Sequence, residues 1–304
     1  MLPAAPRAGG HRFTARLAGW FPVDTLRVRT LTSRVVATPG ARGSSGLATP
    51  KDALQLTTAT EIEIQSCTPV AKAAEVFEIR PYTPHCQVIC AEGDHAVIGV
   101  SPGNSYFSAR RITDLAQWGI DHFNQVDFVY TDLHVAEMYE TLGYTPDDAR
   151  RKAVKNLRGV RAKVTSAVET AGSTGGRLRA HAMSDFVGNP AYRRIHDHIW
   201  TLLDTDAEFR QTCDTLVDSF LSSKVLDGKA GTDRQREVCL KYICAEAPLF
   251  LDTPAILGVP SSLNCYHQLL PMAELLYARG SGLRASRNQG HAMVTPAEGD
   301  SDAR

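Results

Sequence analysis

Ser101 is the side chain best placed for nucleophilic chemistry in this sequence. It follows the apolar run His95–Val100 directly, and Pro102-Gly103-Asn104 comes next. The β-branched run predicts a buried strand, and the proline and glycine predict a turn after it. Ligands of open α/β sheets usually bind beyond the carboxyl ends of strands. We therefore expect Ser101 to lie at a ligand-binding edge of a sheet.

A phenol and a carboxylate form a second candidate cluster far along the chain. Tyr242 and Glu246 are four residues apart in a helical pattern, so both project from one helix face. Apolar residues surround them, and a buried carboxylate is costly unless a cation or a donor meets it. The pair therefore fits either a tertiary salt bridge or a catalytic role. A second apolar run, at 255–259, predicts a strand whose end precedes three polar side chains: Asn264, Tyr266 and His267.

The residues around Ser101 match the G-x-S-x-G pattern of the α/β-hydrolase nucleophile elbow. Asp252 and His267 follow the serine in the order expected of a catalytic acid and base. In that fold, however, the residue after the nucleophile donates its backbone N–H to the oxyanion hole, and Pro102 has no N–H. A serine esterase is therefore the second interpretation of this site rather than the first.

A long helical pattern at 147–168 carries charge of one sign. From Arg150 to Lys163 the sequence has no acidic residue and seven basic ones: Arg150, Arg151, Lys152, Lys155, Arg158, Arg161 and Lys163. Exposed helices usually mix signs to gain pairs between neighbouring turns. The stripe of Arg151, Lys155 and Arg158 suits a phosphate backbone, and without interleaved aromatics it would position a nucleic acid rather than read its bases. A non-catalytic RNA-binding protein is the third interpretation.

Composition and charge narrow the class of protein. The chain has 304 residues, of which 43% are hydrophobic and 22% charged, and its formal net charge is zero. The composition is typical of a globular protein. Because the net charge is zero, any nucleic-acid partner must bind to a local basic patch. No apolar run approaches the ~20 residues of a membrane helix. Seven cysteines without a C-x-x-C pattern predict free buried thiols in a reducing cytoplasm and no metal site.

The strands and helices between these residues must position them. Strands are predicted at 87–91, 95–100, 126–131 and 255–259, and helices at 109–124, 147–168, 190–224 (in two segments), from Thr232 to about Pro248, and at 269–279. Asp132 and His134 follow the third strand, where they would line the same cleft or cap the next helix. Residues 1–50 hold seven arginines, no lysine and one acidic residue, which indicates a disordered basic tail.

Two stretches carry a resemblance to a known family. GVSPGNSYFS at 99–108 and YICAEAPLFLDTPAILGVPSSLNCYH at 242–267 closely resemble the cyclodipeptide synthases, and the likeness extends over 77–295, including VDFVYTDLH at 126–134. Within the family the sequence is most similar to members that make cyclo(L-tyrosyl-L-tyrosyl). The resemblance implies an α/β fold with a Rossmann-like, mostly parallel sheet flanked by helices, similar to the catalytic domain of class Ic aminoacyl-tRNA synthetases.

The resemblance also implies the domains and partners. One synthase domain would span 77–295, after a disordered extension at 1–76 and before a loose tail at 296–304. Family members take amino acids from charged tRNA and need neither ATP nor another cofactor, and this sequence shows no HIGH-like or KMSKS-like signature and no P-loop. We therefore expect a cytoplasmic enzyme whose partner is aminoacyl-tRNA, most of all tyrosyl-tRNA, with no DNA or membrane partner. Whether the enzyme forms a homodimer is left open by the resemblance.

By resemblance, Ser101 is the nucleophile that accepts the first aminoacyl group as an ester. Tyr242 and Glu246 match the pair that holds its amino group, so the partner of the carboxylate would be a substrate ammonium. The amine of the aminoacyl-enzyme would attack a second aminoacyl-tRNA, and the dipeptidyl ester would cyclise to release a diketopiperazine. Both substrates are activated esters, so positioning and general acid–base help suffice without a metal.

The remaining motif positions are carried over in the same way. Gly99 matches a glycine where a side chain would intrude on the bound aminoacyl group, and Asn104 matches the loop asparagine that shapes the substrate-binding site. Tyr266 and His267 match positions beside the serine, with Tyr266 as the proton relay in ring closure. The family's tRNA contact falls on the basic helix and is assigned to four residues as a group: Arg151, Lys155, Arg158 and Lys163.

Asn264 falls among the residues that line the first aminoacyl pocket of the family. A polar group at the end of that pocket suits a phenolic hydroxyl, because an apolar substrate would leave the amide unpaired. The amide could instead bond the backbone. We expect tyrosine rather than leucine or phenylalanine as the substrate.

Overall fold

The computed structural model describes residues 76–297 except 173–175, 225–230 and 278–282. Residues 1–75 of the expected N-terminal extension and residues 298–304 of the expected tail lie outside the described residues, as does Cys67. The six cysteines that the structure describes are free, and five of them are buried, as predicted. Over the described ranges, no helix is both long enough and apolar enough to cross a membrane.

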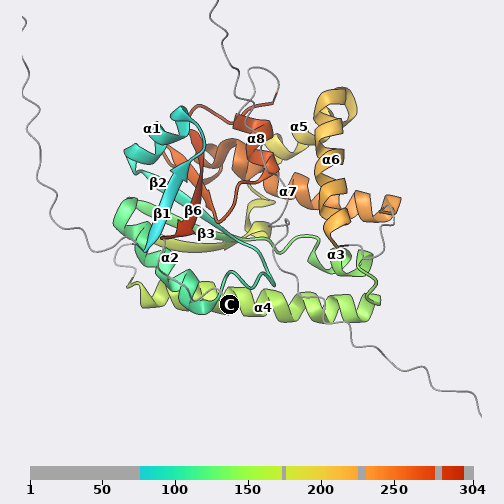
Figure 1. Cartoon of the computed structure of the whole chain (residues 1–304), viewed down its shortest axis with the longest axis horizontal. Coiled ribbons are helices and arrows are strands. Elements are labelled where there is room, and N and C mark those ends of the chain that lie inside the picture. The colour runs from blue at the N-terminus through green and yellow to red at the C-terminus, as the bar shows by residue number, and fades with distance from the viewer. Residues whose placement is uncertain (1–75, 173–175, 225–230, 278–282, 298–304) are drawn as a thin grey trace, which may run out of the picture. The chain divides into compact units, whose positions relative to one another are not determined.

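A six-stranded sheet forms the centre of the described fold, with strand order β1-β6-β5-β2-β3-β4 (Figure 1). β1 runs antiparallel to β6, and the other neighbouring strands are parallel. The predicted α/β fold with a mostly parallel sheet is therefore confirmed. The strands are β1 (Phe77–Pro81), β2 (His95–Val100), β3 (Gln125–Tyr130), β4 (Leu178–Ala182), β5 (Ser262–Tyr266) and β6 (Gln289–Pro296).

One face of the sheet is apolar and covered by helices. Alternate strand residues such as Ile98, Phe128 and Leu263 point to this face and are buried. They pack with side chains such as Ile112 and Val160 in the largest apolar cluster of the described chain. Three helices supply the packing: α1 (Pro84–Glu92), α2 (Ala109–His122) and α4 (Pro146–Thr170).

The opposite face carries the polar residues of the candidate site. Val97, Val129 and Leu249 form a smaller apolar cluster there, which joins the sheet to the long helix α7 (Asp233–Leu257). Thr232 caps α7 as predicted, because its hydroxyl accepts a hydrogen bond from the backbone N–H of the third helical residue. The remaining helices all contact α7: α3 (Val135–Thr141), η2 (Met183–Phe186), α5 (Pro190–Thr205), α6 (Ala207–Lys224) and α8 (Pro271–Tyr277).

The predicted strand at 87–91 is wrong, because these residues lie inside α1. Thr83 begins the helix: its hydroxyl accepts a hydrogen bond from the backbone N–H of Cys86, and Pro84 occupies the first turn. Gly93 ends the helix in the left-handed region, with a φ of 65°. The two caps fix the helix although the run between them is apolar and short.

The predicted strand at 255–259 is also wrong, because α7 continues through Pro248 and Pro254 instead of ending near the first proline. Asp252 alone has non-helical backbone angles within it. The helix resumes after this kink because the Asp252 carboxylate accepts a hydrogen bond from the backbone N–H three residues later, where a new first turn begins. The strand is Ser262–Tyr266, inside the segment expected to be a loop.

Candidate active site

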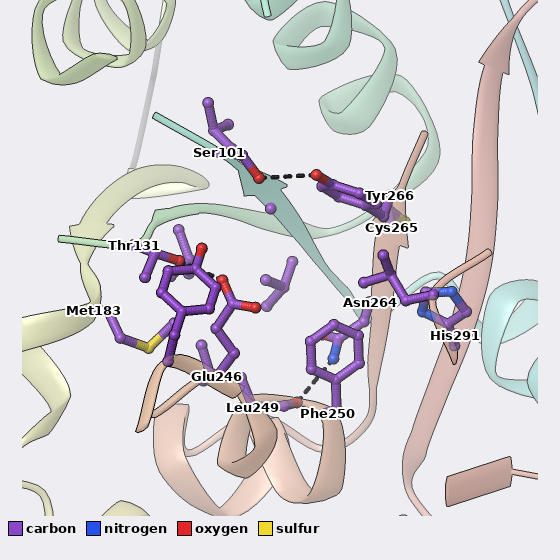
Figure 2. A pocket seen from close by; sticks show the side chains of 16 residues that line it. Ser101, Thr131, Met183, Glu246, Leu249, Phe250, Asn264, Cys265, Tyr266 and His291 are labelled. Carbon is purple, nitrogen blue, oxygen red and sulfur yellow. Dashed lines mark hydrogen bonds between the residues drawn. The ribbon is translucent and has the colours of Figure 1, made fainter. Parts of the chain in front are cut away.

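Ser101 lies directly beyond the carboxyl end of β2, as the sequence predicts. Its side chain is 8% exposed, and its Oγ lies 2.8 Å from the hydroxyl oxygen of Tyr266 (Figure 2). Tyr266 ends β5, which pairs with β2. Burial raises the pKa of the Tyr266 phenol, which stays protonated at neutral pH and can exchange a proton with Ser101. The two predicted residues therefore form one hydroxyl pair.

Gly99 keeps the space beside this pair open. A Cβ added at Gly99 would lie 3.4 Å from the nearest atom of the Tyr266 ring, which is an ordinary contact. Any longer side chain would have to displace that ring or enter the pocket, which Gly99 itself lines. That a side chain here would intrude on a bound aminoacyl group stays a prediction.

The loop after Ser101 is held by Asn104. The Asn104 amide oxygen accepts a hydrogen bond from the backbone N–H of Tyr106 at 2.9 Å, and its amide nitrogen lies 3.3 Å from Nε2 of His267. The His267 ring stacks on Tyr106 with 4.1 Å between ring centroids. Burial lowers the pKa of His267 to about 4, so the ring is neutral. Asn104 and His267 are not among the residues that line the pocket, so the structure places them as supports of the loop.

Tyr242 and Glu246 project from α7 into the same pocket as Ser101, as their spacing predicts. Thr131, the residue after β3, donates a hydrogen bond of 2.6 Å from its hydroxyl to Oε1 of Glu246 (Figure 2). Burial raises the pKa of Glu246, and the hydrogen bond from Thr131 lowers it again. Among the described residues no salt bridge reaches Glu246. The carboxylate therefore faces the pocket without a cationic partner from the described part of the protein.

Asn264 lies on the other side of the pocket from Glu246 (Figure 2). Its Nδ2 donates a hydrogen bond of 2.8 Å to the carbonyl oxygen of Leu249 in α7, so the alternative considered for this amide, a bond to the backbone, is present. Its Oδ1 is buried, and no described group donates a hydrogen bond to it. Asn264 thus anchors α7 with one atom and presents an open acceptor with the other.

Known proteins identify the family to which this site belongs. A profile described as cyclodipeptide synthase matches residues 77–296. A cyclo(L-tyrosyl-L-tyrosyl) synthase of Mycobacterium tuberculosis is 63% identical over 228 residues, which cover 75% of this chain and 79% of that protein. The chain belongs to the cyclodipeptide synthase family. A cyclo(L-leucyl-L-phenylalanyl) synthase of Streptomyces noursei is 34% identical over 70% of this chain and 89% of its own length.

Solved structures of cyclodipeptide synthases share the fold. A Mycobacterium tuberculosis protein, whose structure is described as relating cyclodipeptide synthetases to type I tRNA synthetases, matches with a TM-score of 0.70 and 63% identity over 74% of this chain and 95% of its own. A crystal structure of cyclo(L-leucyl-L-phenylalanyl) synthase matches with a TM-score of 0.67 and 32% identity over 73% and 99%. The family resemblance of the sequence is therefore confirmed, and the protein is an enzyme that forms cyclodipeptides.

The esterase interpretation does not fit this synthase. The Asp252 carboxylate accepts hydrogen bonds from the Ser286 hydroxyl and from the backbone within α7, where it forms the kink. His267 contacts Asn104, and the Ser101 hydroxyl contacts Tyr266. The three residues therefore do not form a chain of acid, base and nucleophile.

Asp132 takes neither of the positions expected for it in the synthase. Its carboxylate accepts hydrogen bonds from the backbone N–H and the hydroxyl of Ser184, which fixes η2 beside the sheet. His134 occupies the N-cap position of α3 without a side-chain capping bond, in the left-handed region with a φ of 60°. Both residues are structural in the described fold.

The basic helix of the sequence is α4, and a groove along it is lined by Arg151, Lys155 and Arg158. Arg150 and Arg151 also pair with Asp147 and Asp148 in the first turn, so this end of the helix is less one-sided than the sequence indicated. Lys163 differs from the group, because its ammonium donates a hydrogen bond of 2.9 Å to the carbonyl oxygen of Phe107. It ties α4 to the loop that follows Ser101.

Two polar residues of the pocket were not predicted. Thr131 directly follows β3, whose bounds were predicted to within one residue, but nothing in the sequence connects it to a carboxylate 115 positions later. His291 lies on β6, which was not predicted, and its buried ring lines the pocket near Asn264. Only the pairing of β5 with β6, in which Asn264 and His291 are direct partners, places His291 at the pocket.

Proposed function

We propose that this synthase condenses two tyrosyl groups, taken from tyrosyl-tRNA, into cyclo(L-tyrosyl-L-tyrosyl). The observation that carries the proposal is the amide of Asn264: this residue lines the pocket, and its Oδ1 is buried without a described donor. A phenolic hydroxyl can donate to this oxygen, whereas leucine or phenylalanine would leave it unpaired at a cost of roughly 1–3 kcal/mol. The name of the relative that is 63% identical supports the same substrate.

The reaction begins with transfer to Ser101. The Ser101 Oγ attacks the carbonyl carbon of a tyrosyl ester, and the bond from that carbon to the terminal ribose oxygen of the tRNA breaks. The hydroxyl proton of Ser101 passes to the leaving ribose oxygen. The Tyr266 hydroxyl, 2.8 Å from the serine Oγ, is the group placed to relay it. Ester exchange starts from an activated acyl group, so no ATP is needed.

Two further steps complete the ring. The amine of the Ser101-bound tyrosyl group loses a proton and attacks the carbonyl carbon of a second tyrosyl-tRNA, which releases that tRNA and leaves a dipeptidyl ester. The free amine of the dipeptidyl group then attacks the ester carbon, the bond to Ser101 breaks, and the serine regains its proton. Tyr242 and Glu246 line the same pocket, and the Glu246 carboxylate is the counter-ion placed to hold the substrate ammonium before each attack.

The groove of α4 is the proposed contact for tRNA. Arg151, Lys155 and Arg158 line it and are exposed, so they can meet phosphates at little desolvation cost, Arg151 by exchanging its ion pair with Asp148. Lys163 enters this proposal only indirectly, since its ammonium is bound to the loop of the active site. A tRNA that engages α4 would therefore lie on an element tied directly to the serine loop.

Expression in a bacterial host with mass spectrometry of the medium tests the proposal. Wild-type protein should release cyclo(L-tyrosyl-L-tyrosyl), and Ser101→Ala should release none. Ser105→Ala is the matched control, because Ser105 lies in the same loop but is exposed, and it should retain product formation. Folded wild-type protein that yields no diketopiperazine, or an undiminished yield from Ser101→Ala, would refute the proposal. Hydrolysis of small activated esters without tRNA would instead favour an esterase.

A further inference from the structure

His291 is a buried polar residue in the pocket that the steps above do not use. In the parallel pairing of β5 with β6 its direct partner is Asn264, so the two side chains stand on the same face of the sheet. Both line the pocket, and Figure 2 shows the imidazole beside the Asn264 side chain. The residue is 0% exposed, and neither ring nitrogen has a hydrogen-bond partner among the described residues.

No described residue forms a hydrogen bond with the His291 ring, although the Asn264 side chain lies beside it. The backbone N–H donates to the sulfur of Cys86, and the backbone carbonyl accepts from the N–H of Tyr82, so the main chain is satisfied. The nearest aromatic rings are Phe250 and Tyr277, with centroids 5.9 and 6.1 Å away. The Tyr277 hydroxyl is occupied with the carbonyl oxygen of Phe250 at 2.8 Å. A hydrogen-bond partner for the imidazole would therefore have to come from a ligand in the pocket.

The charge state of the ring decides which partner it can take. Burial lowers the pKa of His291 to about 4, so the imidazole is neutral at physiological pH. A neutral imidazole has one N–H donor and one acceptor nitrogen. An unsatisfied buried donor or acceptor destabilises the folded state, and an apolar residue of similar size would avoid this cost. The position is therefore shaped for a ligand with a polar atom rather than for packing.

We propose that His291 is a specificity-determining residue that donates a hydrogen bond from its ring to the phenolic oxygen of the tyrosyl group in this pocket. A phenol has one donor and one acceptor function, and the two pocket residues supply the complement: Asn264 Oδ1 accepts, and the His291 N–H donates. Phenylalanine satisfies neither group. The inference rests on the proposed function, because it names the contact by which that function selects tyrosine.

The test compares two substrates that differ only in the hydroxyl. The tyrosine tRNA is charged either with tyrosine or with phenylalanine, and the purified enzyme is given both in competition, with product ratios read by mass spectrometry. Wild type should favour the tyrosyl form by at least about 100-fold, since sites built to bind a hydroxyl reject analogues that lack it. His291→Leu should reduce the preference at least about tenfold by losing kcat/KM for the tyrosyl form, with the phenylalanyl form unchanged or improved.

Controls separate recognition from folding. His291→Gln, which keeps a donor and an acceptor, should retain more of the preference than His291→Leu. Tyr277→Phe perturbs the packing around the imidazole at a residue that does not itself line the pocket, and it should lower activity with both substrates equally or not at all. Melting temperatures verify that each variant is folded.

Each outcome has one meaning. Wild type that makes no cyclodipeptide from tyrosyl-tRNA refutes the proposed function itself. Wild type that forms the product but uses the tyrosyl and phenylalanyl forms equally overturns the role of His291 without any variant. An unchanged preference in folded His291→Leu or in His291→Met overturns it as well, and would leave the imidazole nitrogens to ordered water.

Discussion

Replacing Thr131 with valine should weaken the binding of the substrate amine by the Glu246 carboxylate while the fold stays intact. Thr131 is 5% exposed, and its hydroxyl donates a 2.6 Å hydrogen bond to Oε1 of Glu246. Valine has nearly the same shape and lacks the donor. A hydrogen bond to a charged group contributes about 1.5–3 kcal/mol, which corresponds to roughly 10- to 100-fold in kcat/KM if Glu246 must be ionised to hold the substrate amine.

The same substitution should change the pH dependence of the reaction. Burial raises the pKa of Glu246 and the Thr131 hydrogen bond lowers it, so Thr131→Val moves this pKa further upward. The ionised, amine-binding form then appears only at higher pH, and the acidic limb of the kcat/KM profile shifts toward higher pH. A merely structural role of Thr131 would lower activity at every pH by the same factor.

The assay is single-turnover and steady-state kinetics with purified tyrosyl-tRNA from weakly acidic to weakly basic pH. Thr141→Val is the matched control: the Thr141 hydroxyl also donates 2.8 Å to a protein oxygen, the Met138 carbonyl, but Thr141 does not line the pocket. The control should keep the wild-type pH profile. A Thr131→Val enzyme with wild-type kcat/KM and an unmoved acidic limb would refute the reasoning.

Three other features of the described chain can be tested in the same way. Tyr266→Phe should lower kcat by about 10²–10⁴-fold, because the proton relay beside Ser101 is removed, while Tyr144→Phe, whose hydroxyl contacts Lys152 away from the pocket, should not. Glutamine at Arg151, Lys155 and Arg158 of the α4 groove should weaken activity and make it less dependent on salt. The slope of log activity against log salt concentration should fall by up to about 0.9 for each phosphate that is no longer neutralised. Arg210→Gln on α6 is the control and should change neither. The free energy of unfolding should fall as the pH drops from about 6.5 to 4, because His291, with a pKa of about 4 in the fold, takes up a proton more readily when the chain is unfolded. The decrease approaches about 3 kcal/mol. Denaturant titrations of His291→Leu should show a smaller decrease over the same pH range.

The parts of the fold with strong local patterns were predictable. β2, β3 and α2 combine a clear apolar period with caps or turn residues at their ends, and the structure has them within a residue or two of the expected bounds. Ser101 could be placed for the same reason, since it is the first residue after β2. The prediction of 87–91 as a strand failed because Thr83 and Gly93, which lie outside the apolar run, decide its conformation.

The second error had a larger consequence for the site. Reading 260–267 as a loop hides that Asn264 and Tyr266 are alternate residues of one strand and therefore share a face. Pro248 and Pro254 look like helix ends, but α7 accommodates both around the kink at Asp252. The strand β6 has no local sequence signal strong enough to predict it. The partnership of its His291 with Asn264 depends on strand register, which only the folded chain supplies.

The functional groups of the pocket come from different structural elements and lie on different sides of it. Ser101 and Tyr266 form the hydroxyl pair, and Thr131 and Glu246 lie on one side of the pocket in Figure 2, with Asn264 and His291 on the other. In the proposed mechanism, acyl transfer and amine holding therefore do not depend on the groups proposed to contact the side chain of the substrate. Substitutions at Asn264 and His291 can change the amino acid used while the reaction stays the same. The proposed separation predicts that synthases named for different amino acids, such as the relatives that are 63% and 34% identical to the chain, differ at these substrate-facing positions rather than at Ser101 or Glu246.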